Sequence, residues 1–215
     1  MPKINILDTE DRWDRNIEDE FLWWPRVQWI DPGGTSGLSQ VWFDPKALFE
    51  GKTTAKVVLA HSQMYLNGPE TGTNGQVNRY MRMARSLSYE HDSDEPEYRP
   101  GLALGCESFR LRIVNADWEF LAPVRIRAAL EDRLADWPNP LAGEDALGVP
   151  LRLQTPSDAK NSFTDDRLRQ LRMYTPGPDH IRDSTRHCLL WIRKLRTAGL
   201  EFFKEAHGYE EGWFA

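Results

Sequence analysis

The chain of 215 residues is long enough for one sizeable α/β domain with extensions, and it is short for two full domains. Its hydrophobic content of 40%, with nine Trp residues, indicates a packed core, and its charged content of 28% indicates a solvated surface. No apolar run approaches the roughly 20 residues that span a bilayer. Residues 1–20 are acidic and polar, which is unlike a secretory signal, so we expect a cytoplasmic protein.

The formal net charge of -6 is the main compositional objection to a nucleic-acid partner, because phosphate binding usually requires a basic surplus. A basic surplus is nevertheless present locally. Residues 150–204 carry 11 Lys and Arg against 6 Asp and Glu, a balance of +5, whereas residues 1–24 carry 3 basic and 7 acidic residues, a balance of -4. The sequence therefore predicts a basic surface in the last third of the chain.

The two cysteines, Cys106 and Cys188, fall inside predicted core elements. Neither has zinc-site spacing to another Cys or His. We expect both to be small buried thiols in a reducing compartment.

The first half of the chain predicts an arm followed by three short strands. Residues 1–24 form an appended acidic arm that becomes aromatic at residues 21–24. Strands are expected at residues 27–31, 38–43 and 56–60, with a tight turn over the glycine-rich residues 33–37. Because the connections between these strands are short, we expect them to be antiparallel.

The second half predicts helices that alternate with two further strands. Helical periodicity covers residues 76–88 and 123–137, and Val124, Ala128 and Leu134 are expected to point inward from the second of these helices. The fourth and fifth strands are expected at residues 102–109 and 151–154. A short helix opens at Pro156, and the last helix runs from Pro178 to about residue 197.

This order of elements predicts an α/β fold with a mixed five-stranded sheet, its first three strands antiparallel, flanked by helices. We expect an arm at residues 1–24, one domain at residues 25–200 and a tail at residues 201–215. An inserted loop and helix is expected around residues 62–100. In such a sheet a functional site lies along the ends of the central strands.

An acidic residue closes the first predicted strand of the domain. Asp31 is followed by Pro32, which donates no ladder hydrogen bond, and by Gly33 and Gly34, which let backbone come close to a ligand. Its carboxylate is therefore expected at the sheet edge, facing a cleft. A β-hairpin turn that simply begins with Asp explains the same residues equally well.

A second acid, Glu107, lies inside the fourth predicted strand, where an ionised side chain is costly to bury without a partner. Ala103 and Gly105 share its face of the strand, which leaves room beside the carboxylate for a ligand or for a closely packed helix. Two interpretations stay open: a bound metal ion, or a structural ion pair with an Arg such as Arg110 or Arg112.

The last helix carries a polar stripe formed by His180, Asp183 and His187, which are spaced three and four residues apart. A neighbouring apolar stripe is expected to face the sheet, and it consists of Ile181, Cys188, Ile192 and Leu195. Taken alone, His180 is explained as a surface residue, and Asp183 is explained by the helix dipole.

Taken together, Asp31, Glu107, His180 and Asp183 bring three carboxylates and an imidazole from separate elements to one place. A divalent ion requires hard ligands that converge in this way, so we expect these four residues to be catalytic and to bind metal. Basic residues gather in the same part of the chain. Those expected to contact DNA phosphates are Lys160, Arg182 and Arg186, although a solvated helix face explains most charges of this kind.

Four stretches carry a family pattern in order: WIDPGGTSG at residues 29–37, CESFR at 106–110, QTPSDAK at 154–160 and DHIRDSTRH at 179–187. This pattern resembles the RuvC-like Holliday junction resolvases of the ribonuclease H superfamily, particularly the phage-encoded members, over roughly residues 26–197. The acidic net charge, the N-terminal arm and the segment at 62–100 depart from the family.

The resemblance implies that Asp31, Glu107 and Asp183 bind metal, with His180 in a fourth position that some members fill with Asp. It further implies two Mg²⁺ or Mn²⁺ ions, a homodimer, and paired nicks in branched DNA during recombination, repair or phage DNA processing. The expected activity is that of a crossover junction endodeoxyribonuclease in bacterial or phage-infected host cytoplasm.

Three other functions fit parts of the sequence. A nuclease of the same fold that cuts flaps, forks or RNA–DNA hybrids is the main alternative, because target choice depends on shape and dimer geometry. A non-catalytic DNA-binding protein that keeps the fold is a second. The turn at residues 31–37 also resembles the phosphate loop of sugar kinases and actin-like ATPases, but the chain has no second copy of this loop.

Overall fold

The computed structural model describes residues 3–6, 26–33, 35–43, 48, 56–64, 73–86, 103–108, 121–137, 139, 146–171, 173–177 and 179–199. The strands are β1 (Lys3–Ile6), β2 (Arg26–Asp31), β3 (Gly37–Phe43), β4 (Lys56–Met64), β5 (Ala103–Glu107) and β6 (Arg152–Gln154). The helices are α3 (Thr73–Ser86), α4 (Leu121–Ala135), α5 (Pro156–Ser162), α6 (Asp165–Gln170) and α7 (Asp179–Ala198).

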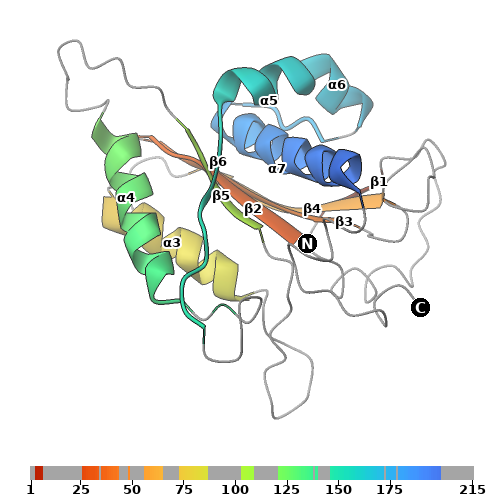
Figure 1. Ribbon diagram of the computed structural model, residues 1–215. Coiled ribbons are helices and arrows are strands. Elements are labelled where there is room, and N and C mark those ends of the chain that lie inside the picture. The colour runs from red at the N-terminus through yellow and green to blue at the C-terminus, as the bar shows by residue number, and fades with distance from the viewer. Residues whose placement is uncertain are drawn as a thin grey trace.

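The strands form one mixed sheet in the order β1-β4-β3-β2-β5-β6 (Figure 1). The β2–β3, β3–β4 and β1–β4 pairs are antiparallel, whereas β5 pairs with β2, and β6 with β5, in the parallel direction. The predicted α/β class with a mixed sheet is therefore confirmed. The parallel strands β2 and β5 are neighbours, so their carboxyl ends meet at the same edge of the sheet.

The expected number of five strands is wrong, because the described residues form a six-stranded sheet. The extra strand is β1, which lies within the predicted arm and pairs with β4 from Lys3↔Leu59 to Ile6↔Lys56. Its sequence, KINI, alternates polar and apolar residues, which is the period of a strand. The aromatic residues 21–24, the loop at 92–100 and the tail at 201–215 lie outside the described residues.

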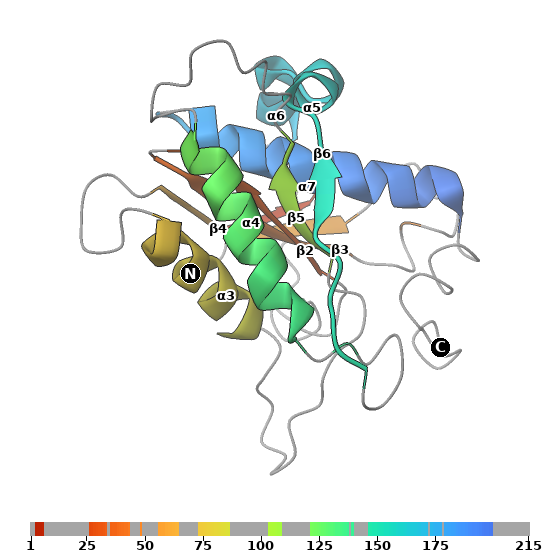
Figure 2. The same cartoon turned by 60° about the vertical axis from the view of Figure 1, so that its left-hand side comes forward.

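Helices cover both faces of the sheet, as Figures 1 and 2 show. α7 crosses one face, with α5 and α6 beyond it, and α3 and α4 cover the other face. Alternation along β2 directs Val27 and Trp29 into the core under α7, and Ile30 into the core under α3 and α4. Asp31 follows in the same alternation and faces α7.

The prediction for the inward face of α4 is wrong for two of its three residues. Val124 is 39% exposed and Ala128 is also exposed, while Leu134 is buried as expected. The buried stripe is Ile126, Leu130 and Leu134, spaced four residues apart on one side of the helix. Val124 lies two residues before Ile126 and therefore falls on the exposed side of the helix.

Both cysteines are free and buried, as expected. Burial raises the pKa of each thiol far above its usual range, which keeps both protonated. None of the helices in the described part of the chain combines the length and the apolar character that crossing a membrane requires.

Candidate metal centre

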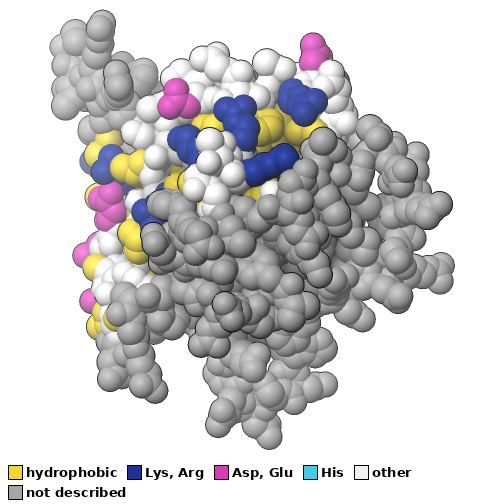
Figure 3. All heavy atoms as spheres, turned by 45° about the vertical axis from the view of Figure 1, so that its right-hand side comes forward, with side chains coloured by type: hydrophobic (Ala, Val, Ile, Leu, Met, Phe, Trp, Pro, Cys, Tyr) yellow, Lys and Arg dark blue, Asp and Glu magenta, His cyan; other side chains and the backbone are white. Residues whose placement is uncertain are grey.

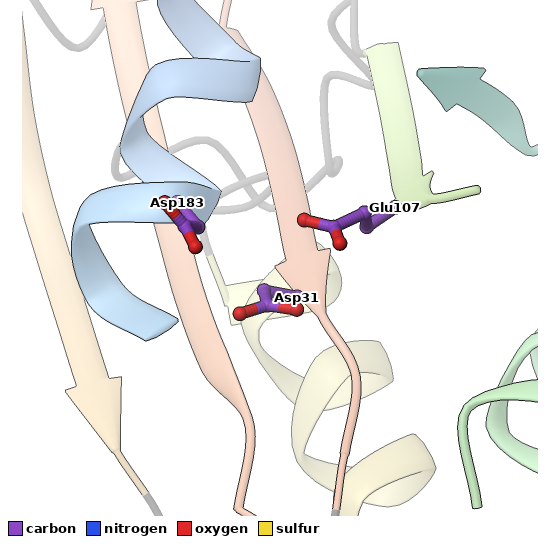
Figure 4. Close-up of side chains that lie close together, drawn as sticks. All are labelled: Asp31, Glu107 and Asp183. Carbon is purple, nitrogen blue, oxygen red and sulfur yellow. The ribbon is translucent and has the colours of Figure 1, made fainter. Parts of the chain in front are cut away.

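Three carboxylates converge at the edge of the sheet beneath α7. Asp31 is the last residue of β2, Glu107 is the last residue of β5, and Asp183 lies in the second turn of α7. Each contributes one carboxylate oxygen to a group in which all of these atoms lie within 4.8 Å of one another. Figure 4 shows the three side chains pointing toward one another from their three elements.

The three carboxylates are almost completely buried: the exposed fractions are 6% for Asp31, 4% for Glu107 and 5% for Asp183. An ionised carboxylate offers only hydrogen-bond acceptors, so three of them in one place repel one another unless a cation or protons lie between them. Burial, together with the charges of Glu107 and Asp183, raises the pKa of Asp31 to about 6, although the hydrogen bond from His180 acts to lower it. This donor set of hard oxygens fits a divalent cation such as Mg²⁺ or Mn²⁺.

His180 lies beside the carboxylates and contacts one of them directly. Its Nδ1 is 2.9 Å from Oδ2 of Asp31, and its side chain is 41% exposed. The hydrogen bond to Asp31 raises the pKa of this imidazole. The sequence predicts that His180 binds metal together with the three carboxylates. In the structure one of its ring nitrogens, Nδ1, contacts the carboxylate of Asp31.

Asp183 is held in place by two cations of its own chain. Its Oδ2 lies 2.9 Å from Nζ of Lys160, whose side chain is 50% exposed, and its Oδ1 accepts a hydrogen bond from Arg186. Lys160 thus stands at the site with its ammonium group at the boundary between the carboxylates and solvent.

Arg182 and Arg186 are only 7% and 6% exposed, because α5 and α6 cover this side of α7. Arg186 joins Asp183 to Asp165 of α6 and donates to the carbonyl of Phe163 over 2.8 Å. Arg182 pairs with Asp179 and donates to the carbonyls of Thr175 at 2.9 Å and Gly177 at 2.6 Å. Their guanidinium groups are committed to contacts within the chain, so we do not retain them as phosphate contacts.

A cluster of hydroxyl groups docks the first turns of α7 onto β3. The Ser39 hydroxyl lies 2.7 Å from that of Ser184 and 2.9 Å from that of Thr185, and all three are buried. Next to this cluster, a Cβ added to Gly37 would lie 1.9 Å from the carbonyl oxygen of His180. Because Gly37 is also paired with Asp31, this close approach positions the start of α7 over the end of β2.

The turn after Asp31 is tied to α3. The Gly33 amide donates to the Ser36 hydroxyl over 3.1 Å, Gln76 donates to the Gly33 carbonyl over 2.8 Å, and Ser36 also bonds Gln76. The stretch after Asp31 is thus a hairpin turn, and this turn fixes the position of the Asp31 carboxylate. A hairpin turn and a functional Asp31 are therefore compatible.

Glu107 lies beside Asp31 and Asp183, as the metal interpretation expects, whereas Arg110 and Arg112 of the ion-pair interpretation lie outside the described residues. The space left by Gly105 is filled by Trp29, because a Cβ on Gly105 would lie 2.2 Å from the Trp29 ring. The partner of Glu107 among the described residues is His187, whose Nε2 lies 2.9 Å from Oε2 of the carboxylate. The stripe shared with Asp183 was the sequence signal for His187, but spacing alone did not indicate which carboxylate it would meet.

No protein-family model matches the chain, and no curated protein sequence matches it. Among solved structures, three chains match. One of them is T. thermophilus RuvC in complex with a Holliday junction substrate, which is 18% identical, with 77% of this chain and 91% of that chain covered and a TM-score of 0.46.

Proposed function

We propose that the protein is a divalent-metal-dependent endonuclease that hydrolyses phosphodiester bonds in branched DNA, with the Holliday junction as its main target. The observation that carries this proposal is the convergence of Asp31, Glu107 and Asp183 from three separate elements into one buried group. Three of the four sequence stretches that resemble the RuvC-like resolvases of the ribonuclease H superfamily each contain one of these residues.

The carboxylates of Asp31, Glu107 and Asp183 would hold two Mg²⁺ or Mn²⁺ ions. A bound divalent ion supplies Lewis-acid activation of an attacking water and stabilises charge on the leaving oxygen. The chain supplies the rigid frame for this chemistry. β2 and β5 fix two of the carboxylates at one sheet edge, and the hydroxyl cluster around Ser39 fixes the third through α7.

Two further side chains have chemical roles in the proposal. His180, with Nδ1 bonded to Asp31 and a partly exposed ring, is placed to take up or release a proton at the rim of the site. Lys160 stands beside Asp183 with half of its side chain in solvent, where its ammonium group can hold a DNA phosphate.

In the described part of the face shown in Figure 3, Lys and Arg side chains gather beside hydrophobic ones. Exposed basic residues in this part of the fold belong to α6 and to the last turns of α7: Arg167, Arg169, Arg193, Lys194 and Arg196. Such a surface can track a DNA backbone. Paired nicks require two active sites, so the proposal includes a homodimer.

The test is cleavage of labelled DNA in the presence and absence of Mg²⁺ or Mn²⁺. A four-way junction, a fork, a linear duplex and an RNA–DNA hybrid are compared, with Asp31→Asn as the inactive variant. Asp158→Asn removes an exposed carboxylate of α5 and is the matched control, which is expected to keep full activity.

Symmetric, metal-dependent nicks confined to the junction are the expected result. If only the fork or the hybrid is cut, the protein is a nuclease whose target is that substrate and not the four-way junction. An Asp31→Asn protein as active as the native one, or no cleavage of any substrate under any metal condition, would contradict the proposal.

A further inference from the structure

Glu107 reaches the carboxylate group from the end of a short strand, and one oxygen of its side chain is already occupied. Its Oε2 lies 2.9 Å from Nε2 of His187, a residue of α7 that is completely buried. An imidazole N–H donated to one carboxylate oxygen fixes the torsion of the side chain and leaves the other oxygen for a cation.

The ring of His187 is itself held rigidly. It stacks on the ring of Trp29, with the ring centroids 5.8 Å apart and the planes 14° from parallel. Trp29 can lie there because Gly105, on the neighbouring strand, has no side chain to obstruct its ring. The imidazole plane is thus set by packing, independently of its hydrogen bonds.

The second ring nitrogen meets an amide. Nδ1 of His187 lies 3.2 Å from Oε1 of Gln154, the last residue of β6, while Nε2 of that amide has no partner although it is buried. Exchanging the two ends of the amide places its N–H₂ group toward Nδ1. With the amide in that orientation, His187 would accept from Gln154 and donate to Glu107.

We infer that His187, oriented by Gln154 and Trp29, is a positioning residue that holds Glu107 in the conformation needed to bind a divalent cation. This inference rests on the proposed metal centre and deepens it. Outer partners that orient a metal-binding side chain are worth about 10–100-fold in metal affinity or activity when removed. His187 does not belong to the group of converging carboxylates, so its effect passes through Glu107.

Two amide substitutions of similar chemistry separate this role from simple core packing. In His187→Gln the side-chain amide reaches the position of Nε2 and can still donate to Glu107, whereas in His187→Asn it reaches only the position of Nδ1. The measurement is Mn²⁺ binding by isothermal titration calorimetry at pH 7.5 on the native protein and both variants, with circular dichroism as the check of folding.

We expect Mn²⁺ affinity close to the native value in His187→Gln and a loss of about 10–100-fold in His187→Asn. Gln154→Met tests the outer end of the same chain of contacts without placing a new group in the core, and it should weaken Mn²⁺ binding by a smaller factor. If His187→Asn does not fold, the Mn²⁺ affinity of Gln154→Met tests the inference in its place.

Native Mn²⁺ affinity in Gln154→Met, together with equal affinities in the two folded His187 variants, would overturn the inference and leave the metal centre standing. Absence of Mn²⁺ binding in the native protein would instead overturn the proposed function, and the inference with it. The two failures therefore give different results in the same titration.

Discussion

The carboxylate of Asp31 lies where its negative charge is unfavourable unless a cation is close. Burial raises its pKa to about 6, and the charges of Glu107 and Asp183 act in the same direction. Without metal the folded protein therefore retains a proton at pH values where the unfolded chain has lost it. The free energy of unfolding should fall as the pH rises from about 4 to 6, and the cost of ionising Asp31 is fully present above this range.

Asp31→Asn removes this charge and keeps the shape of the side chain. We expect the variant to melt at a higher temperature than the metal-free native protein at pH 7.5, and the difference to shrink as the pH is lowered toward 4. Thermal unfolding followed by circular dichroism, in EDTA and across this pH range, measures it. Equal melting temperatures at every pH would contradict the description of Asp31 as a carboxylate ionised at a cost.

Lys160 makes a different prediction, because its pair with Asp183 is half exposed. Such a pair contributes at most about 1 kcal/mol to stability, so Lys160→Gln should fold normally. If the ammonium group holds a DNA phosphate, the variant should bind every DNA substrate more weakly. The slope of log affinity against log salt concentration should then become smaller by about one.

Fluorescence anisotropy of a labelled junction between low and moderate salt, with the Asp31→Asn background preventing cleavage, gives this slope. Arg127→Gln is the control, since Arg127 pairs with Glu131 on α4, on the far side of the sheet. An unchanged slope in Lys160→Gln, or an equal change in Arg127→Gln, would remove Lys160 from the DNA-binding surface.

At the scale of elements, the site depends on how closely α7 approaches β3. A methyl group at Gly37 would overlap the backbone of His180, so Gly37→Ala must displace the first turn of α7 and with it Asp183. We expect a loss of roughly 1–3 kcal/mol in the free energy of unfolding, as in other overpacked positions. Mn²⁺ affinity should fall as well, because one ligand moves away from the other two.

Gly177→Ala separates displacement from loss of stability in general. Gly177 has a φ of 108°, and nothing lies within 4 Å of an added Cβ, so Ala is strained there without pushing on α7. Urea unfolding and Mn²⁺ titration of both variants should show lower stability in each and weaker Mn²⁺ binding in Gly37→Ala alone. Native Mn²⁺ affinity in a destabilised Gly37→Ala protein would show that the docking of α7 does not set the site.

The elements that carry the site were predictable because each has a strong local signal. The strand that ends at Asp31 carries Val27, Trp29 and Ile30 and stops at Pro32 and glycine. The strand predicted at residues 102–109 begins with a continuous apolar run, and in the structure it ends at Glu107 instead of passing through it. The order of these strands and the last helix then placed the acids at one edge. The extra strand β1 has a strand pattern too, but its partner residues in β4 lie 50 to 56 positions further along the chain, and nothing local indicates the pairing.

Residue roles that depend on packing between distant elements were not predictable in the same way. Arg182 and Arg186 read as basic residues of a helix, and only the position of α6 shows that Asp165 and backbone carbonyls enclose them. Likewise, the small residue at Gly105 left room for a ligand or a closely packed helix, whereas the ring of Trp29 fills that space. Periodicity gives the face of a residue and not what lies opposite it.

At the scale of the whole molecule, a cation bound only by the folded chain must stabilise it. At a Mn²⁺ concentration about 100 times the dissociation constant the gain is about 2.7 kcal/mol, which for a chain of this size raises the melting temperature by roughly 5–10 °C. Because protons and metal compete for the same carboxylates, the increase should be larger at pH 7.5 than at pH 5.5. Differential scanning calorimetry at the two pH values measures it, and a larger increase at the lower pH would contradict the competition.

The most direct test of the metal centre is anomalous diffraction from crystals of the native protein grown or soaked with Mn²⁺. We expect an anomalous peak within bonding distance of carboxylate oxygens of Asp31, Glu107 and Asp183, and no such peak in Asp31→Asn crystals treated in the same way. Native crystals with no peak among these three side chains, at Mn²⁺ concentrations that support cleavage, would contradict it.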